Sequence, residues 1–560
     1  MIRQEIANLI EKSTKELRKA EVLPEFELPP IQVEKPEEKI HGDYATNIAM
    51  AIAKQAKKHP IEIANILSEK LKVKSEKLFE KIEVANPGFI NFFLSKEYLQ
   101  KQVGGILKQG EKFGQLKIGR NKKINVEFIS ANPTGPLTLG NGRGGFCGDV
   151  LANVLAKAGS QVEREYYVNN VGEQIRKLGH SVLGDAEAVY KGDYIKGLQK
   201  RIKGNNPETV GEAAAKVILK EMIKPSVKKM GISFDVWFLE KSLYQKKEVE
   251  KALAWLKKNG LIYEKEGARW FKSTKFGDDK DRVLIKADGE TTYLASDIAY
   301  LRNKFQRGFN KLIYIWGADH YGYVARIKAV AEAFGFHKEK IKIIIMQLVR
   351  LFEAGKETRM AKRTGAYITL DELINEVGLD VARFFFLTRA ADSHLNFDLD
   401  LAKEQSEKNP VYYIQYAHAR IGAILRQCGK SEITNAKSQT NTKFQISNSK
   451  LQLLTHPSEL NLIKELIRFP EIIEDTAKDY QVQRLPQYAT DLAAALHQFY
   501  RDCRVLTDYN PPATLPALSS KGRGPSARPL REARIGLILA TKTVLKNTLD
   551  LMGISAPEKM

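Results

Sequence analysis

Hydrophobic and polar positions change their spacing along the chain, and these changes mark the first structural unit. Within residues 1–100, apolar residues recur at helical spacing over 48–71, interrupted at Pro60. Two strand-like runs follow, the second of which is the aromatic stretch 88–95. The pattern predicts a small α+β unit at the start of the chain.

The middle of the chain has the pattern of a parallel α/β sheet. A strand is expected over 123–130, a Gly/Pro-rich loop follows it, and a helix is expected over 144–158. Residues 172–280 are Lys-rich and predict helices, so we expect a helical insertion of about 100 residues within the α/β unit. The runs that predict buried strands are 123–130, 161–168, 311–320 and 340–349.

The last part of the chain predicts helices alone. Its amphipathic segments are interrupted by two polar tracts, at about 429–450 and 510–527, which we interpret as loops. A chain of 560 residues suits roughly three domains. The expected boundaries are 1–105 for the α+β unit, 106–400 for the α/β unit with its insertion at about 172–280, and 401–560 for the all-α unit.

Composition adds an electrostatic expectation. The chain has 89 Lys plus Arg against 67 Asp plus Glu, a net charge of +22, which favours a polyanionic partner. Its three cysteines, Cys147, Cys428 and Cys503, lie far apart, so we expect neither a disulfide scaffold nor a protein-bound structural metal. Without a run of about 18 apolar residues, no membrane partner is expected. We expect a cytoplasmic monomer.

A glycine-rich loop at 130–145 is the first candidate for chemistry. It follows a predicted strand and opens a predicted helix, so its backbone amides and the positive helix end could bind a nucleotide phosphate. Because it contains no Gly-Lys-Ser/Thr, it is not a P-loop. Taken alone, a tight turn explains the glycines equally well.

The wider segment Ala-Asn-Pro-Thr-Gly-Pro-Leu-x-x-Gly-x-Gly-Arg resembles the signature loop of class I aminoacyl-tRNA synthetases, in the version of the arginyl-tRNA synthetases. Thr138 and Asn141 occupy the positions of the two signature histidines, and their hydroxyl and amide groups can still donate hydrogen bonds. The resemblance implies catalytic roles for these two residues and Gly140. It also implies ATP binding by Pro136, Leu139, Gly142 and Arg143.

A basic loop at 356–365 is the second candidate. Transfer of a nucleotidyl group needs cations near the developing pyrophosphate charge, although a surface loop could have the same composition. The order Arg-Met-Ala-Lys-Arg-Thr-Gly resembles the Lys-Met-Ser-Lys loop of class I enzymes. Lys362 matches the second lysine and Arg359 replaces the first, which implies that both are catalytic, with Met360 and Arg363 binding ATP.

Recognition of an arginine guanidinium needs carboxylates. Glu127, at the strand that enters the glycine loop, and Asp297 are the candidates, and a structural salt bridge is the alternative for each. The tracts 291–300 and 316–324 are similar to those of bacterial arginyl-tRNA synthetases. The resemblance implies that His320 contacts ATP and that arginine is bound by Glu127, Ser130, Asn132, Asn169, Tyr293, Asp297 and Asp319.

Both flanking units resemble domains of the same family. Asn86, Phe89 and Asn91 match positions in the additional N-terminal domain that contacts the tRNA elbow, although the phenylalanine could equally be strand core. Residues 401–560 resemble the helical anticodon-binding domain, in which Tyr416 and Arg420 are candidate tRNA contacts.

The resemblance covers nearly the whole chain. It implies an α/β fold: a Rossmann-like class I synthetase catalytic core with a helical insertion, preceded by a small α+β domain and followed by an all-α helical-bundle anticodon-binding domain. The implied activity is activation of L-arginine with ATP and Mg²⁺, followed by transfer of arginine to tRNA(Arg). The alternative is an inactive tRNA-binding paralogue, because the signature histidines are replaced.

Overall fold

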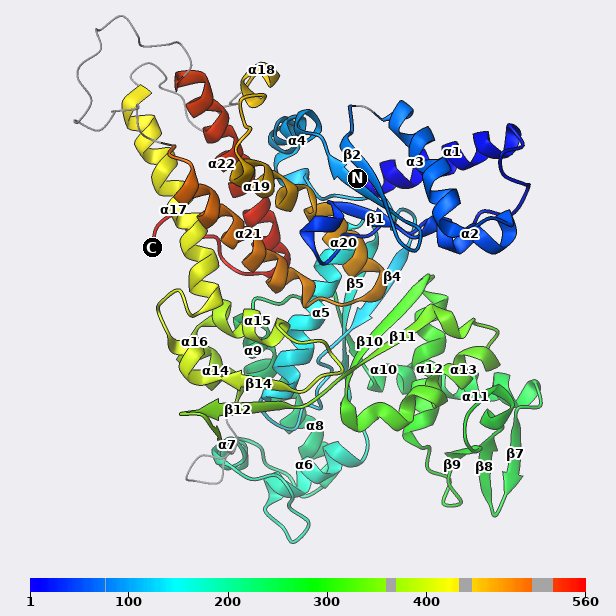
Figure 1. Ribbon diagram of the computed structural model, residues 1–560. Coiled ribbons are helices and arrows are strands. Elements are labelled where there is room, and N and C mark those ends of the chain that lie inside the picture. Colours follow the sequence, from blue (N-terminus) through cyan, green and yellow to red (C-terminus); the bar gives the residue numbers. More distant parts are fainter. Residues whose placement is uncertain (76, 359–368, 433–445, 506–526) are drawn as a thin grey trace, which may run out of the picture.

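The protein is described from a computed structural model over residues 1–75, 77–358, 369–432, 446–505 and 527–560 (Figure 1). Its parallel sheet with covering helices, its small α+β unit and its helical C-terminal part confirm the expected fold class. No helix within the described ranges is long and apolar enough to cross a membrane.

The N-terminal unit packs helices against a three-stranded antiparallel sheet. Pro60 stands at the first position of its helix, where its missing N–H costs no hydrogen bond. The sheet has the order β1-β3-β2. The elements are α1 (Ile2–Lys19), β1 (Tyr44–Thr46), α2 (Ile48–Ala56), α3 (Pro60–Lys74), β2 (Phe79–Ala85), β3 (Phe89–Leu94) and α4 (Lys96–Gln109).

Five parallel strands form the central sheet, in the order β11-β10-β4-β5-β6. The chain moves outward from β4 through β5 to β6 and then returns to the other side of β4 with β10 and β11. This is the doubly wound arrangement, and its switch point lies between β4 and β10. The strands are β4 (Lys123–Glu127), β5 (Gln161–Val168), β6 (Val236–Leu239), β10 (Lys311–Gly317) and β11 (Ile341–Met346).

The sheet separates two hydrophobic cores. Along β10, Ile313 belongs to the core that contains α5 (Leu139–Lys157), whereas Leu312 and Tyr314 belong to the core that contains α12 (Tyr293–Gln306) and α13 (Val324–Ala333). Because alternate residues of a strand point to opposite faces, both sides of this sheet are covered by helices. The chemistry therefore has to emerge at the strand ends.

The inserted segment differs from the helical one that its Lys-rich sequence predicts. Strand β6 within it extends the central sheet, and a separate antiparallel sheet of β7, β8 and β9 follows. The four residues of β6 are too few to display a strand period, so pairing with β5 decides their conformation. The other elements are α6 (Glu173–Leu183), α7 (Asp193–Arg201), α8 (Pro207–Ile218), α9 (Lys224–Lys229), α10 (Lys241–Gln245), α11 (Glu248–Lys258), β7 (Ile262–Lys265), β8 (Ala268–Phe271) and β9 (Arg282–Ile285).

A small sheet and a helical bundle complete the chain. The sheet has the order β13-β12-β14 and leads through short helices into the bundle. Its elements are β12 (Val349–Glu353), β13 (Lys356–Thr358), α14 (Leu370–Val377), α15 (Leu379–Leu387), β14 (Leu395–Asp398) and α16 (Leu399–Lys403). The bundle contains α17 (Pro410–Glu432), α18 (Asn448–Leu451), α19 (Pro457–Ile467), α20 (Phe469–Asp479), α21 (Arg484–Asp502) and α22 (Ala527–Met552).

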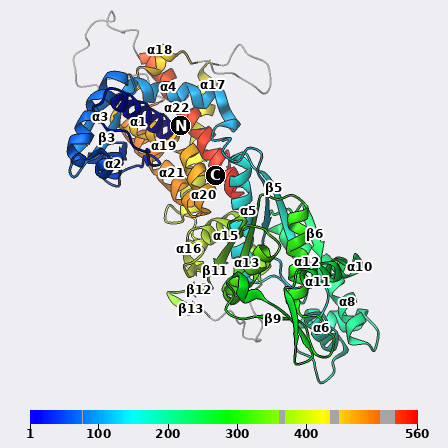
Figure 2. The same cartoon turned by 90° about the vertical axis from the view of Figure 1, so that its right-hand side faces the viewer.

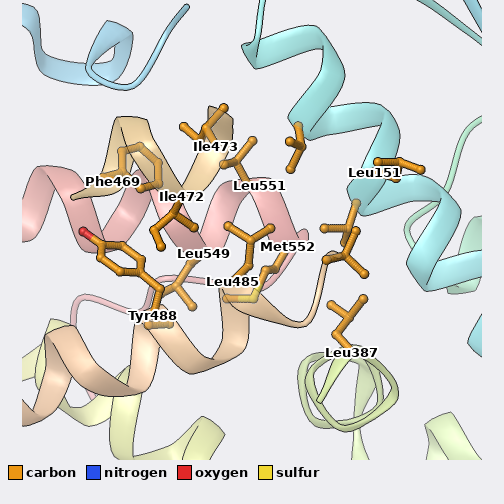
Figure 3. Packing of buried hydrophobic residues seen from close by; sticks show 14 of the residues in the cluster. Leu151, Leu387, Phe469, Ile472, Ile473, Leu485, Tyr488, Leu549, Leu551 and Met552 are labelled. Atoms are coloured by element: carbon orange, nitrogen blue, oxygen red, sulfur yellow. The ribbon is translucent and has the colours of Figure 1, made fainter. Parts of the chain in front are cut away.

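The bundle shares a hydrophobic core with α5. Figure 2 shows the N-terminal unit and the bundle together in one half of the molecule, with the inserted segment at the opposite end. In Figure 3, Leu485 of α21 and Leu551 and Met552 of α22 lie between Leu151 of α5 and Leu387 of α15 on one side and Phe469 and Tyr488 on the other. The helix that opens at the glycine loop is therefore anchored in the C-terminal bundle.

Arg383 lies at the polar centre of this junction and is 1% exposed. Its guanidinium donates to the backbone carbonyl of Met552 (2.9 Å), to that of Met230 (2.6 Å) and to the carboxylate of Asp149 on α5. One side chain thus ties α15 to the end of α22, to the turn after α9 and to α5.

Replacing Arg383 is expected to destabilise this junction. In Arg383→Ala the buried Asp149 loses the nearer of its two cations and keeps only Arg164, at 3.6 Å. Breaking a buried ion pair by removing one partner typically costs about 3–5 kcal/mol. Denaturant-induced unfolding followed by fluorescence measures the change. Arg389→Ala removes an exposed arginine two residues beyond α15 and serves as the control. Equal midpoints for the two variants would contradict this role of Arg383.

Candidate active site

A cavity of about 850 Å³ opens at the switch point of the central sheet. On one side it is lined by Ile129, Ser130, Ala131 and Asn132, which follow β4, and on the other by Gly317 at the end of β10 and by residues 318–320, which follow it. Ligands of doubly wound sheets bind in the crevice at this place, because the flanking loops separate there. Position alone makes this cavity the candidate active site.

Helix α5 begins at Leu139, five residues earlier than its sequence pattern predicts. Thr138 is the N-cap: its Oγ1 accepts from the Asn141 backbone N–H (3.4 Å), and Asn141 Oδ1 accepts from the Thr138 N–H (2.9 Å) and hydroxyl (2.9 Å). This reciprocal capping box starts the helix at Leu139, where the many glycines weaken the helical pattern in the sequence. The Asn141 Nδ2 group is left to donate elsewhere.

The helix start faces the cavity. Thr138, Leu139, Gly140, Asn141 and Gly144 all line it. Free backbone amides and the positive end of a 19-residue helix attract an anion, so this wall suits a phosphate group.

Two residues that the resemblance assigns to ATP binding, Gly142 and Arg143, make packing and hydrogen-bond contacts within the protein. A Cβ on Gly142 would come within 2.5 Å of Leu370, so the glycine is required by packing against α14. Arg143 is fully buried, and its guanidinium donates to the carbonyls of Gln347 (2.7 Å), Ala390 (2.9 Å) and Ser393 (2.8 Å). Neither lines the cavity, and neither does Pro136. The contacts of Gly142 and Arg143 come from parts of the chain that are distant in sequence, so a local motif does not reveal them.

Glu127 ends β4 and lines the cavity, although it is only 5% exposed. Its Oε2 accepts from Lys304 Nζ (2.5 Å) and from the Tyr300 hydroxyl (2.8 Å), and its Oε1 accepts from Ser130 Oγ (3.3 Å). This carboxylate already has an internal cation.

Glu240, one residue past β6, is a cavity carboxylate that the sequence analysis missed. It is 3% exposed, and burial raises its pKa. With its amide nitrogen facing the two acceptors, Asn169 donates to Glu240 Oε2 (2.9 Å) and to the Val171 carbonyl (2.9 Å). The signal that could have found Glu240 is an acidic residue directly after a short apolar run.

Asp297 lies one helical turn after Tyr293 on α12, and both line the cavity. Tyr323 donates a hydrogen bond to Asp297 Oδ2 (2.7 Å). Burial, with the neighbouring charges of Glu240 and Glu127, raises the pKa of Asp297 to about 7. Among the described residues, no cation acts on the pKa of Glu240 or Asp297. A cationic ligand in this cavity would therefore stabilise the ionised form of both carboxylates.

The remaining expected residues lie around the cavity at different depths. Ser130 also accepts from the Tyr167 backbone N–H (3.1 Å), and Asn132 is exposed at the mouth. The side chains of Asp319 and His320 are 79% and 58% exposed and 3.5 Å apart. They occupy the rim, whereas Glu127 and Glu240 form the floor.

The expected tRNA contacts lie on two other surfaces. Asn86, Phe89 and Asn91 line a second cavity of about 380 Å³ in the N-terminal unit. Phe89 is 39% exposed, while Asn91 is buried. On α17, the Arg420 guanidinium lies 5.9 Å from the Tyr416 ring and 4.0 Å from that of Tyr500. An exposed aromatic ring beside an amide suits an unpaired base.

Two further expectations concern the basic loop and a bound metal ion. Arg359, Met360, Lys362 and Arg363 lie outside the described residues. Within the part of the chain that is described, no group of three or more His, Cys, Asp or Glu side chains could hold a metal ion.

Comparisons with known proteins agree with this geometry. The chain matches the arginyl-tRNA synthetase N-terminal domain over residues 2–94, the class I (R) tRNA synthetase catalytic domain over 102–392 and the DALR anticodon-binding domain over 414–560. It is 45% identical to an arginine–tRNA ligase of Carboxydothermus hydrogenoformans, covering 94% of both chains. It is 44% identical to that of Caldanaerobacter subterraneus subsp. tengcongensis, covering 100% of this chain and 99% of the relative.

A solved structure supports the fold independently. The arginyl-tRNA synthetase of Thermus thermophilus superimposes with a TM-score of 0.73 over all of both chains at 21% identity. Together with the two full-length relatives and the three consecutive domain matches, this similarity leads to one conclusion. The chain belongs to the arginyl-tRNA synthetase family.

Proposed function

We propose that this chain is an arginine–tRNA ligase. In the first step, a carboxylate oxygen of L-arginine attacks the α-phosphorus of ATP, arginyl-adenylate forms and pyrophosphate leaves. In the second, a hydroxyl of the terminal ribose of tRNA(Arg) attacks the activated carbonyl, and AMP leaves. Family membership over the whole chain supports this reaction.

One observation carries the choice of substrate. Among the described residues, no cation acts on two carboxylates of the cavity, Glu240 and Asp297, and the start of α5 lines another part of its wall. A guanidinium satisfies the carboxylates, and a phosphate satisfies the helix end. Glu127, Ser130, Asn132, Asn169, Tyr293 and Asp319 would complete the arginine site.

Catalysis in this proposal depends on orientation and electrostatic stabilisation, without a covalent enzyme intermediate. Thr138, Gly140 and Asn141 would donate hydrogen bonds to the phosphates, and Leu139 and His320 would contact the nucleotide. Arg359 and Lys362 would stabilise the leaving pyrophosphate, with Met360 and Arg363 beside them. Mg²⁺ would enter as the counter-ion of the ATP phosphates.

We further propose that tRNA contacts two surfaces. The N-terminal cavity around Phe89, with Asn86 and Asn91, would receive a base of the tRNA elbow, while Tyr416 and Arg420 on α17 would contribute to the anticodon site. We also propose that the chain acts as a monomer in the cytoplasm.

Isotopic pyrophosphate exchange tests the reaction directly. The purified chain is expected to exchange labelled pyrophosphate into ATP when arginine is present, assayed with and without tRNA(Arg), and to form arginyl-tRNA. Exchange with lysine in place of arginine should be at background. Intact tRNA binding without exchange or aminoacylation would instead identify an inactive tRNA-binding paralogue.

Glu240→Gln is expected to weaken arginine binding at least about 30-fold. The substitution keeps the size of the side chain but removes one partner of a buried charge pair, which typically costs about 2 kcal/mol or more. Isothermal titration with arginine measures the affinity. Glu264→Gln, on the exposed edge of β7, should bind arginine normally. Normal binding by Glu240→Gln would remove this residue from the arginine site.

Arginine affinity is expected to fall as the pH drops below 7. The pKa of about 7 means that Asp297 in the empty site is protonated at lower pH, and a neutral carboxyl attracts a guanidinium weakly. Since only about a tenth of such a group is ionised one unit below its pKa, affinity at pH 6 should be about tenfold weaker than at pH 8. Titrations across this range, repeated with Asp297→Asn, measure the effect. The variant should bind weakly at every pH, and an unchanged pH profile would show that another group is responsible.

A further inference from the structure

One face of α12 continues from the cavity into the core. Tyr293 and Asp297 line the cavity, and Tyr300 and Lys304 follow at helical spacing below it, with Arg307 just beyond the end of the helix. Of these lower three, only Tyr300 reaches the cavity wall. All three contact carboxylates on β4 or β5.

Lys304 is fully buried and approaches Glu127 from behind the cavity. Its ammonium is 2.5 Å from Glu127 Oε2 and 3.8 Å from Glu165 Oε1. It also lies 4.6 Å from the centre of the Tyr300 ring and 4.2 Å from that of Tyr314. This enclosure makes it an internal counter-ion that solvent does not reach.

The neighbouring carboxylate has a separate cation. Glu165 is paired with Glu127 across β4 and β5, so the two like charges lie side by side. Arg307 donates to Glu165 Oε2 (2.6 Å) and Oε1 (2.9 Å) and also contacts Glu163 (3.2 Å). Burial would raise the pKa of Glu165, but Lys304 and Arg307 outweigh burial and lower it. Arg307 has no contact with Glu127 among those that the structure describes.

Glu127 therefore meets the substrate with its charge compensated and its orientation restrained. Lys304 and Tyr300 hold one carboxylate oxygen, and Ser130 contacts the other at 3.3 Å. A carboxylate held in this way can still accept a hydrogen bond from a ligand. Without Lys304, Glu127 would keep its hydrogen bonds from Tyr300 and Ser130 but would lose its buried cation and one of its restraints.

We propose that Lys304 is a positioning residue, which holds Glu127 as a charge-compensated hydrogen-bond acceptor for arginine and leaves Glu240 and Asp297 as the carboxylates that attract the guanidinium. The proposal rests on the proposed function. Glu127 has Lys304 as an internal cation, whereas no described cation acts on Glu240 or Asp297.

A double-mutant cycle on Glu127 and Lys304 tests the proposal. Lys304→Met keeps the length of the side chain and removes the charge, and it should raise the KM for arginine at least about tenfold while changing the KM for ATP less than twofold. Once Glu127→Gln is present, adding Lys304→Met should lower kcat/KM for arginine by less than about twofold. Independent, multiplied losses in the double variant would overturn the positioning role.

Arg307→Met is the matched control, because it removes a cation from Glu165 and Glu163 without touching Glu127. It should lower the thermal unfolding midpoint and leave the KM for arginine within about twofold of the unmodified chain. A rise equal to that of Lys304→Met would mean that any loosening of α12 produces the effect, and the proposal would fail.

Tyr300→Phe covers the case in which Lys304→Met does not fold. It removes only the hydroxyl that donates to Glu127 (2.8 Å) and to Glu165. It should raise the KM for arginine about threefold, and this effect should vanish in the Glu127→Gln background. An equal effect in both backgrounds would contradict the proposal. Loss of exchange in the unmodified chain would instead overturn the proposed function.

Discussion

Burial of negative charge at the ends of parallel strands is the constraint on which the site depends. Glu127 and Glu165 are register partners on β4 and β5, and both are almost completely inaccessible to solvent. Moving such ions out of water costs several kcal/mol each unless cations and hydrogen bonds replace the water. Helix α12 and the residue that follows it supply Lys304, Arg307 and the Tyr300 hydroxyl, so the carboxylates determine how this helix sits on the sheet.

Two other carboxylates of the cavity, Glu240 and Asp297, have no such cation acting on them among the described residues. Glu240 receives a hydrogen bond from Asn169, and Asp297 receives one from Tyr323, but burial raises the pKa of both groups. A cationic ligand would stabilise the ionised form of both carboxylates and so lower both pKa values. Under the proposed function, the guanidinium would be attracted by the two carboxylates on which no described cation acts.

Helix α5 connects this chemistry to the rest of the molecule. Its first turn lines the cavity and presents unsatisfied amides, while Leu151 and Asp149 further along it belong to the junction with α15 and α22. The glycine at 142 allows the close approach of α14 to the same helix. One helix therefore joins the wall of the cavity to the C-terminal bundle.

Much of this organisation could be predicted from the sequence. Strand-like runs located β4, β5, β10 and β11. Those of β10 and β11 are mostly apolar, because strands buried on both faces have a strong local signal. The ordered motifs indicated the family and singled out Thr138, Asn141 and Asp297, which line one cavity. Local sequence was sufficient wherever a residue's environment is set by its own strand, helix or motif.

Tertiary structure alone decided the rest. The short strand β6 forms by pairing with β5, and it brings Glu240 into the cavity. The sequence motif suggests that Arg143 contacts a phosphate. In the structure its guanidinium donates to three carbonyls that lie more than 200 residues away in the chain. Glu127 and Glu240 are chemically identical in the sequence, and the buried ammonium of Lys304 beside one of them makes them different. Charge compensation is a property of neighbours in space, which no local pattern of residues records.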